Sequence, residues 1–370
     1  MPTKAADGNG SLQRMMQKPL IVGPFQAEIP AIEAGLAGYS DMAMRVVARR
    51  RECPYAVTEA LLDRVIITGG RGREKGLVLS DEDHPVAGQL LGSEADEMAA
   101  AARILVEYGF DTVDLNFACP VKKVMGRCRG GYLLSDSDQA IAIMRAVRDA
   151  VKVPLTMKLR RGLDDSAQAA EHFERIFETA EQLEFAAVAV HGRTVVQKYT
   201  GRADWDFIRR LKARRPRMTL LGSGDVFCAA DALQMYETTG VDGVWIARGA
   251  IGNPWIFSEF ATLLRGEPLP EPPRISAQRA ALLEHFDLAE TIYGAEHASR
   301  QMRKMGIKYS RLHPDGAAVW KAFIEAKSRA DWEHVLDRYY SIDGPGRRQS
   351  SVADAADLYN GCDIAGAAAA

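Results

Sequence analysis

Several features that mark specialised classes of protein are scarce or missing in this sequence. The 370 residues include only 5 cysteines, at irregular spacing and without a CxxC pair, which argues against a disulfide framework and a zinc site. No apolar run approaches the roughly 18–20 residues needed to cross a membrane, and Met1–Lys18 is polar and has no signal-peptide core. We therefore expect a cytoplasmic protein with reduced thiols and no bound metal.

Charge of one sign is also not in excess, because 47 basic residues stand against 49 acidic ones and the net charge is −2. A near-neutral total argues against a wholly basic, histone-like binder of nucleic acid, although it allows a local basic patch. The hydrophobic share of 47% is ordinary for a globular protein, and a chain of this length can bury a large core.

From about residue 28 onward, short β-branched runs alternate with amphipathic stretches. The predicted strands are Ile29–Leu36, Tyr55–Thr58, Val86–Leu91, Thr112–Phe117, Pro154–Leu159, Ala186–Val190, Thr219–Gly222 and Gly243–Ala247. The helix candidates between them are Glu94–Tyr108, Asp136–Ala150, Ala167–Leu183, Asp204–Arg214 and Ala229–Thr238. This rhythm predicts an α/β fold, a (β/α)8 TIM barrel. A doubly wound sheet is less favoured, because no GxGxxG follows the first strand.

The chain divides into four predicted parts. Residues 1–27 lack periodicity and are predicted to be a disordered N-terminal extension, and residues 28–265 form the barrel. After a proline-rich linker, three helices are predicted at Ile275–Tyr293, Glu296–Leu312 and Ala317–Tyr340. They predict a small all-helical domain at 274–343, followed by a flexible tail at 344–370.

Polar and small residues leave the predicted strands at the end of the barrel where such folds carry their active sites. They are Gly35, Leu36, Ala37, Gln89, Asn116, Cys119, Lys158, His191, Ser223, Gly224, Asp225, Ala247 and Arg248. Each alone is more often structural, but their convergence at one end of a barrel indicates a single pocket. The last two strand exits, GSGD and ARGA, offer backbone N–H groups and a cation, which is typical of a phosphate site.

Lys158, Gln89 and His191 are then placed to face the rest of a phosphorylated ligand. A flavin ring needs hydrogen-bond partners along its pyrimidine edge and a cation near N1, which a glutamine and a lysine supply. A phosphorylated sugar would use the same groups, so both ligands stay open on these residues alone.

Cys119 is the most specific candidate for chemistry. It lies between Asn116 and Pro120 at a predicted strand end, whereas buried free cysteines are usually inert packing. A free thiol has a pKa of about 8.5 and is mostly protonated at pH 7. Cys119 is therefore better suited to donate a proton than to attack as a thiolate.

Two basic segments favour a nucleic-acid partner. The loop after Cys119 contains Lys122, Lys123, Arg127 and Arg129. The segment from Ser299 to Arg311 contains Arg300, Arg303, Lys304, Lys308 and Arg311 without an acid, and positions 300, 304, 308 and 311 share one helical face. A solvated face is the usual explanation of such a stripe, but cations that track a phosphate backbone are also what RNA binding needs.

At this point the sequence resembles a known family, the tRNA-dihydrouridine synthases, in its bacterial branch. The resemblance extends from about Ile29 to Tyr340 and rests on NFACPVKKV, VAVHGRT, LGSGDV and WIARGAIGNPWIF, of which the first is the most specific. It implies a barrel that binds FMN and a helical domain that recognises tRNA. In that family NADPH reduces the flavin, a hydride passes from N5 to C6 of a uracil, and a cysteine protonates C5.

The resemblance assigns roles residue by residue. Cys119 falls on the family's acid, and Asn116 falls beside the substrate base, with Lys122, Lys123, Arg300, Arg303, Lys304 and Lys308 expected to bind tRNA. The positions that fall on flavin contacts are Gly35, Leu36, Ala37, Gln89, Lys158, His191, Ser223, Gly224, Asp225, Ala247 and Arg248. The chain departs from the family pattern at Gly35-Leu36, Ala118, Ser223, Ala247 and the bulky Tyr132. We expect a monomer.

Three alternatives remain besides an enzyme that acts on tRNA or rRNA. A flavin oxidoreductase of small molecules would explain the barrel but not the basic helices. A barrel that binds a sugar phosphate would be colourless, and a non-catalytic RNA-binding relative would not need Cys119.

Overall fold

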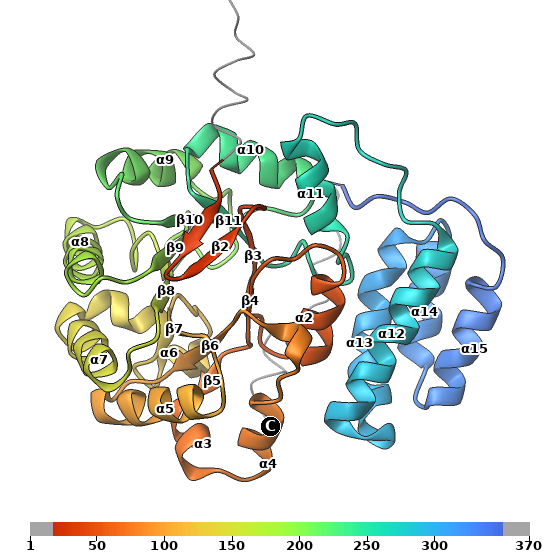
Figure 1. Cartoon of the computed structure of the whole chain (residues 1–370), viewed down its shortest axis with the longest axis horizontal. Coiled ribbons are helices and arrows are strands. Elements are labelled where there is room, and N and C mark those ends of the chain that lie inside the picture. Colours follow the sequence, from red (N-terminus) through yellow and green to blue (C-terminus); the bar gives the residue numbers. More distant parts are fainter. Residues whose placement is uncertain (1–17, 351–370) are drawn as a thin grey trace, which may run out of the picture.

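The computed structural model, which describes residues 18–350, places a closed β-barrel beside a group of helices (Figure 1). The barrel consists of eight parallel strands: β3 (Ala31–Glu33), β4 (Ala56–Val57), β6 (Val86–Leu91), β7 (Thr112–Phe117), β8 (Leu155–Arg160), β9 (Ala187–His191), β10 (Leu220–Ser223) and β11 (Gly243–Ile246). Each pairs with the next, β11 returns to β3, and the pairing of β4 with β6 closes the ring. The predicted TIM barrel is confirmed.

Helices surround the barrel and follow its strands. They are α2 (Met42–Arg49), α3 (Asp63–Thr68), α4 (Arg71–Gly76), α5 (Ala95–Glu107), α6 (Lys122–Met125), α7 (Ser137–Ala150), α8 (Ala167–Gln182), α9 (Trp205–Arg214), α10 (Ala229–Thr239) and α11 (Ile256–Leu264). Short 3-10 turns lie at Asp81–Asp83 and Gly130–Ser135, and β5 (Leu61–Leu62) adds a short extra pairing to β6.

Local sequence explains where these helices begin and end. The Asp136 side chain accepts a hydrogen bond from the Gln139 amide at 3.0 Å and caps α7, and Ser166 caps α8 in the same way. Helix α10 ends at Gly240, whose φ of 70° is readily adopted only by a residue without a Cβ. The strands β6 and β8 are buried along their whole length, as expected for parallel strands covered by helices.

A hairpin closes the amino-terminal end of the barrel. It consists of β1 (Leu20–Val22) and β2 (Phe25–Ala27), and it buries Leu20 and Val22 against the barrel interior. The turn at Gly23 lies so close to Pro154 that a Cβ there would come within 2.5 Å of the proline ring. The prediction of disorder up to residue 27 is therefore wrong for the hairpin, and residues 1–17 lie outside the described part of the chain.

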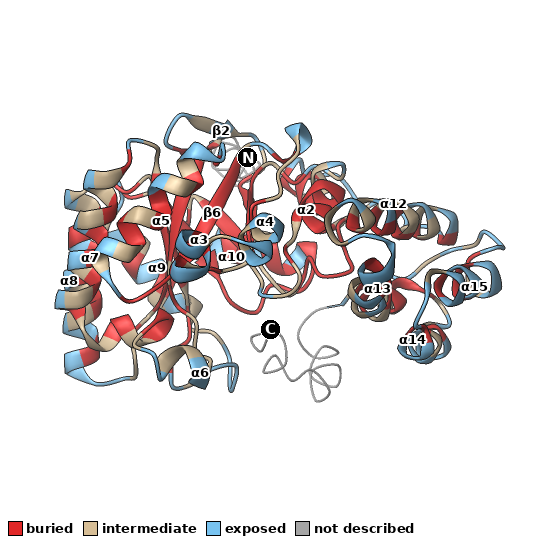
Figure 2. Ribbon diagram, turned by 90° about the horizontal axis from the view of Figure 1, so that it is seen from below, coloured by how far each residue is buried: buried red, intermediate tan, exposed pale blue. Residues whose placement is uncertain are grey.

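The helical domain consists of α12 (Ile275–Tyr293), α13 (Ala295–Tyr309), α14 (Gly316–Glu325) and α15 (Arg329–Tyr339), with a 3-10 turn at Ser310–Leu312. Its core includes Phe286 and Trp332, whose rings lie 4.6 Å apart. Seen from below, α12 lies next to α2, whereas α14 and α15 lie farthest from the barrel (Figure 2). Glu284 of α12 forms ion pairs with Arg50 and Arg51 at the end of α2.

Two further predictions about this region need correction. The predicted helix Ala317–Tyr340 is two helices, because the chain breaks at Ala326 and Ser328 forms a capping box that begins α15. The chain after Gly344 is not a free tail up to Arg348. The Arg347 amide donates to the Leu312 carbonyl at 2.7 Å, and the Arg348 guanidinium pairs with Glu259 at 2.9 Å. Residues 351–370 lie outside the described part.

Candidate active site

A cavity of about 200 Å³ opens at the carboxyl ends of the barrel strands. Most of the residues predicted from the strand ends line it: Gly35, Leu36, Ala37, Gln89, Asn116, Cys119, Lys158, His191, Ser223, Gly224, Ala247 and Arg248. Lys308 of α13 also lines it, although it was predicted to lie on an RNA-binding face. The structure therefore brings together side chains from nearly every barrel strand and one from the helical domain.

The register of the parallel strands explains this convergence. Asn116 of β7 is paired with Lys158 of β8, and the next strand places His191 beside Arg160. His191 is in turn paired with Ser223 of β10. Because parallel strands end at the same edge of the sheet, residues far apart in sequence meet in one layer.

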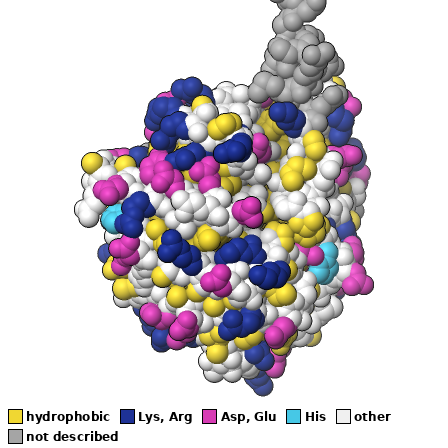
Figure 3. All heavy atoms as spheres, turned by 60° about the vertical axis from the view of Figure 1, so that its left-hand side comes forward, with side chains coloured by type: hydrophobic (Ala, Val, Ile, Leu, Met, Phe, Trp, Pro, Cys, Tyr) yellow, Lys and Arg dark blue, Asp and Glu magenta, His cyan; other side chains and the backbone are white. Residues whose placement is uncertain are grey.

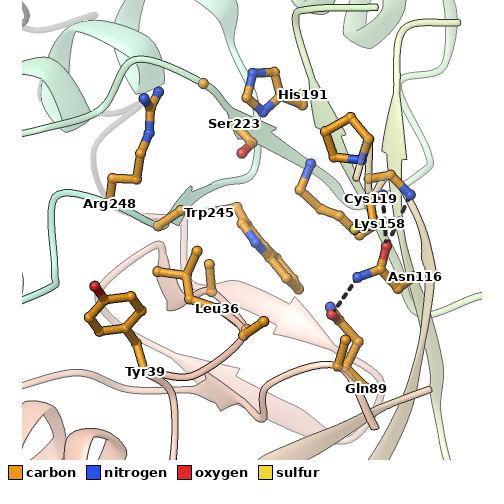
Figure 4. Close-up of a pocket in the computed structure, with 18 of the residues that line it drawn as sticks. Leu36, Tyr39, Gln89, Asn116, Cys119, Lys158, His191, Ser223, Trp245 and Arg248 are labelled. Carbon is orange, nitrogen blue, oxygen red and sulfur yellow. Dashed lines mark hydrogen bonds between the residues drawn. The ribbon is translucent and has the colours of Figure 1, made fainter. Parts of the chain in front are cut away.

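A chain of hydrogen bonds fixes one end of the pocket (Figure 4). The Asn116 amide nitrogen donates to the Gln89 side-chain oxygen at 2.7 Å, and the Gln89 amide nitrogen donates to Asp114 at 2.9 Å. The Asn116 side-chain oxygen accepts from the backbone amides of Ala118 and Cys119, both at 3.1 Å. Since an amide donates from one end and accepts at the other, Asp114 sets the orientation of Gln89, and Gln89 sets that of Asn116.

The hydrogen bonds of Gln89 and Asn116 orient the loop that carries Cys119. Burial raises the pKa of the Cys119 thiol, and the Val121 amide and the Arg160 guanidinium oppose this rise only in part. A raised pKa keeps the thiol protonated at neutral pH. Two glycines pack against the same loop: the Gly131 amide donates to the Cys119 carbonyl at 3.0 Å, and a Cβ on Gly130 would come within 2.9 Å of the Cys119 Cβ.

Two basic side chains of the pocket, Lys158 and His191, share a buried environment. Burial, with a smaller contribution from Arg160, lowers the pKa of Lys158 well below its ordinary value. Burial also lowers the pKa of His191, helped by the nearby positive charge of Lys158. His191 is therefore neutral at pH 7, and the charged form of Lys158 is favoured by an anionic partner.

Arg160 is a pocket residue that the sequence analysis missed. It lies on β8 two residues after Lys158, lines the cavity and is buried. Its guanidinium donates to the Ala118 carbonyl at 3.0 Å and to the Thr194 carbonyl at 2.8 Å, which ties the Cys119 loop to the loop after β9. Burial lowers its pKa to about 10. The alternation of side chains along β8 could have indicated it, since residues two apart share one face.

Tyr39, Tyr199 and Trp245 also line the cavity and were not predicted. Trp245 belongs to β11 and lies with Leu36 between the two ends of the pocket (Figure 4). The ring of Tyr199 lies 4.8 Å from the Arg248 guanidinium carbon. These aromatic residues are common in barrel cores and loops, so no sequence signal separated them from packing residues.

Asp225 is a predicted flavin contact that does not line the cavity. Its carboxylate binds Arg193 at 2.7 Å and the Ala203 amide at 2.7 Å, and it lies 3.5 Å from Arg248. The residue adopts a left-handed φ of 58°, which turns its side chain towards these partners. Asp225 therefore holds the two arginines in place.

The predicted RNA-binding residues occupy different surroundings. Lys122 and Lys123 are exposed on α6, just beyond the loop that lines the cavity. On α13, Arg300 and Arg303 are exposed, whereas Lys304 and Lys308 face the barrel. The Lys304 ammonium donates to the Gly38 carbonyl and lies 5.2 Å from the centre of the Tyr39 ring. The predicted basic face of this helix is thus only partly solvent-exposed.

The basic residues elsewhere on the barrel are mostly paired. On the side of α7 and α8, Lys and Arg side chains alternate with Asp and Glu (Figure 3). There Arg215 binds Glu174 at 3.0 Å, and Arg175 binds Asp138 at 2.5 Å. The exposed arginines of α13 have no such ion pair within residues 18–350.

The lining residues indicate the charge and shape of a ligand that would fit the pocket. Four of them are basic, Lys158, Arg160, Arg248 and Lys308, and none of the described lining residues is Asp or Glu. Buried positive charge without a carboxylate favours an anionic ligand. The wall formed by Ala34, Gly35, Leu36 and Trp245 is apolar and suits a flat ring.

Among residues 18–350, no cluster of His, Cys, Asp or Glu suits a metal, and no helix is long and apolar enough to span a membrane.

Fold and site together describe a (β/α)8 barrel whose pocket combines four basic side chains and an apolar wall with a protonated cysteine. The family model described as dihydrouridine synthase matches residues 33–339. A probable tRNA-dihydrouridine synthase of Mycobacterium tuberculosis is 33% identical over 86% of this chain and 84% of its own. The tRNA-dihydrouridine synthase B of Xanthomonas axonopodis is 34% identical over 86% and 95%. The chain therefore belongs to the dihydrouridine synthase family, which confirms the resemblance, and it is an oxidoreductase.

Solved structures share the fold at low sequence identity. Histamine dehydrogenase from Rhizobium sp. 4-9 aligns with a TM-score of 0.50 and 14% identity over 80% of this chain and 51% of its own. The structure of TcOYE with pHBA aligns with a TM-score of 0.50 and 13% identity over 70% and 95%. At this identity the likeness supports the barrel fold alone.

Proposed function

We propose that this protein reduces specific uridines in tRNA to 5,6-dihydrouridine with FMN as cofactor and NADPH as electron donor. The observation that carries the proposal is the pocket itself. It combines a protonated Cys119 with a flat apolar wall and four basic side chains, Lys158 among them, without a lining carboxylate in the described chain. Membership of the dihydrouridine synthase family and the named tRNA enzymes among its relatives support this assignment.

The residues present fit a phosphorylated flavin. Lys158 and Gln89 supply a cation and an amide for the polar edge of the ring, and Leu36 and Trp245 supply apolar contacts. Ser223, Gly224, Ala247 and Arg248 suit its phosphate, since they offer backbone amides and a guanidinium at the last two strand ends. When bound and reduced, the flavin would supply a hydride to C6 of the uracil.

The chain's own residues account for the rest of the reaction. Hydride addition at C6 leaves negative charge at C5 and O4 of the uracil, which Lys158 and Arg160 stabilise. The Cys119 thiol donates a proton to C5, and the resulting thiolate is stabilised by Arg160 until it regains a proton from solvent. Asn116 holds the backbone amides of the Cys119 loop, so that the thiol is presented from a fixed loop.

The flavin requirement can be tested directly. The protein should purify yellow or take up FMN on reconstitution, and Lys158→Ala should lose flavin or slow its reduction by NADPH, because it removes the cation beside the ring. The measurement is the visible absorbance spectrum with stopped-flow reduction. No flavin band in wild type after incubation with excess FMN would overturn the proposal and favour a sugar-phosphate barrel.

The substrate is tested separately on RNA. Dihydrouridine should disappear at one or more tRNA positions in a strain lacking this gene and return on complementation. Loss of dihydrouridine in rRNA alone would overturn the tRNA assignment but keep the chemistry. Unchanged RNA together with a flavin-loaded protein would favour a small-molecule oxidoreductase.

A further inference from the structure

Lys308 is placed unlike the other basic residues of the helical domain. It belongs to the last turn of α13, only 6% of its surface is exposed, and it lines the cavity at the ends of the barrel strands. A lysine this buried is uncommon. Its place in the lining of the cavity separates it from the exposed arginines of α13, Arg300 and Arg303.

The backbone around Lys308 is fitted closely to the loop that follows β11. A Cβ on Gly252 would lie 2.5 Å from the carbonyl carbon of Lys308 and 2.7 Å from its Cβ. Ile251, the neighbour of Gly252, lines the same cavity. Arg248 belongs to the same loop, two residues after β11 ends, so Lys308 packs against the loop that carries Arg248.

Arg248 lies at the end of the pocket opposite Cys119. In Figure 4, Arg248 lies on one side of Trp245 and Leu36, and Lys158, Asn116 and Cys119 lie on the other. A ligand that spans the pocket thus meets the reacting residues at one end and Arg248 at the other. Asp225, at 3.5 Å, offsets part of the positive charge of Arg248. A dianionic group beside Arg248 would therefore be stabilised further by a second basic side chain.

We propose that Lys308 binds the phosphate of the flavin together with Arg248, so that the helical domain supplies a residue of the cofactor site. This inference rests on the proposed FMN requirement. A phosphate inside the pocket can reach an ammonium that is nine-tenths buried, whereas a polynucleotide backbone at the surface meets Arg300 and Arg303 first. The helical domain then acts on cofactor retention in addition to its proposed contact with RNA.

The test compares FMN with riboflavin, which has the same ring and no phosphate. Lys308→Met keeps most of the apolar stem and removes the charge, and Lys321→Met makes the same change at an exposed site on α14. Dissociation constants of both flavins are measured on apoprotein by fluorescence quenching. Lys308→Met should weaken FMN by about tenfold to a hundredfold, the range for a lost hydrogen bond to a charged group, and leave riboflavin within about twofold.

Each outcome decides the question. Lys321→Met should match wild type for both flavins, and Lys308→Arg should keep the preference for FMN because it retains the charge even if its fit is poorer. Equal weakening of FMN and riboflavin by Lys308→Met, or no change in either, would overturn the phosphate assignment. A loss of RNA affinity alone would also overturn it. Failure of wild type to bind either flavin would instead refute the proposed function.

Discussion

At the scale of single residues, Cys119 carries the proposed chemistry, and its burial makes a prediction about pH. The general acid must be protonated, and a raised pKa moves the loss of its proton to higher pH. We expect reoxidation of pre-reduced enzyme by tRNA to keep its full rate through about pH 8.5, where an ordinary thiol titrates, and to fall only above it. Single-turnover rates between pH 6.5 and 9.5 measure this dependence.

Cys119→Ala is the matching substitution. The variant should bind FMN, accept electrons from NADPH and bind tRNA, but reoxidise roughly 10²–10⁴-fold more slowly, the usual cost of a positioned acid. The alkaline decline seen in wild type should vanish with the thiol. A variant rate within threefold of wild type would return Cys119 to a packing role.

Glu33 on β3 is a buried acid outside the pocket. It is fully buried, neither carboxylate oxygen has a hydrogen-bond partner in the described chain, and burial raises its pKa to about 8 although Arg45 opposes this. Because the folded pKa exceeds the unfolded value, the contribution of Glu33 to stability is full below about pH 4.3 and is lost as pH rises through 8.

Glu33→Gln should remove this dependence. Relative to wild type, the variant should gain free energy of unfolding between pH 5 and pH 8, with a slope of up to about 1.4 kcal/mol per pH unit. Urea unfolding at several pH values measures the gain, and Glu107→Gln at an exposed site on α5 serves as control. A difference between Glu33→Gln and wild type that stays constant with pH would contradict the assignment.

The residues predicted from strand ends illustrate what sequence can supply. Lys158, His191 and Ser223 could be predicted because a parallel barrel places strand ends in one layer, whatever the loops do. Asp225 could not, since its side-chain direction depends on a left-handed φ and on Arg193, which belongs to another loop. Lys308 could be identified as basic and helical, but its neighbours come from the docking of two domains.

At the scale of elements, α13 shows the limits of periodicity. The 3.6-residue repeat placed positions 300, 304 and 308 on one face. In the structure, positions 304 and 308 of that face point towards the barrel, and position 300 is exposed. A repeat defines which residues lie together but not what they lie against. The single predicted helix Ala317–Tyr340 failed for a related reason: an internal Ser-x-x-Asp capping box begins a new helix at Ser328.

Because only part of the basic face of α13 is exposed, the expected RNA-binding residues change. Lys304 is engaged with Gly38, so Arg300 and Arg303 are the exposed cations on this helix. Arg300→Ala with Arg303→Ala should weaken tRNA binding and reduce the salt dependence of the affinity by about one unit per lost phosphate contact. Filter binding at several salt concentrations measures the slope, and NADPH oxidation without RNA should stay near wild type. An unchanged slope would mean that these arginines are only solvated.

At the scale of the whole molecule, the eightfold rhythm of strands predicted the barrel, because each β/α unit repeats the same burial pattern. The packing of the helical domain on the barrel was not predictable in this way. It depends on pairs that no local pattern contains, such as Tyr293 with Asp41 at 2.9 Å and Glu284 with Arg51 at 2.9 Å. These contacts join α12 to the region of α2, and α13, which packs against α12, reaches the pocket with Lys308.

Gly252 tests this docking, with Gly240 as its control. The two glycines have φ values of +71° and +70°, so an alanine strains the backbone equally at both. A Cβ at Gly252 would lie 2.7 Å from the Tyr309 nitrogen, whereas nothing lies within 4 Å of one at Gly240. Gly252→Ala should therefore lower the free energy of unfolding by about 1–3 kcal/mol more than Gly240→Ala in urea unfolding, the usual cost of overpacking.

The same pair of variants also bears on flavin binding. Because the clash separates Lys308 from the loop after β11, only Gly252→Ala should also weaken the binding of FMN relative to that of riboflavin. Equal losses for both alanine variants would mean that the barrel and the helical domain separate without cost at this contact.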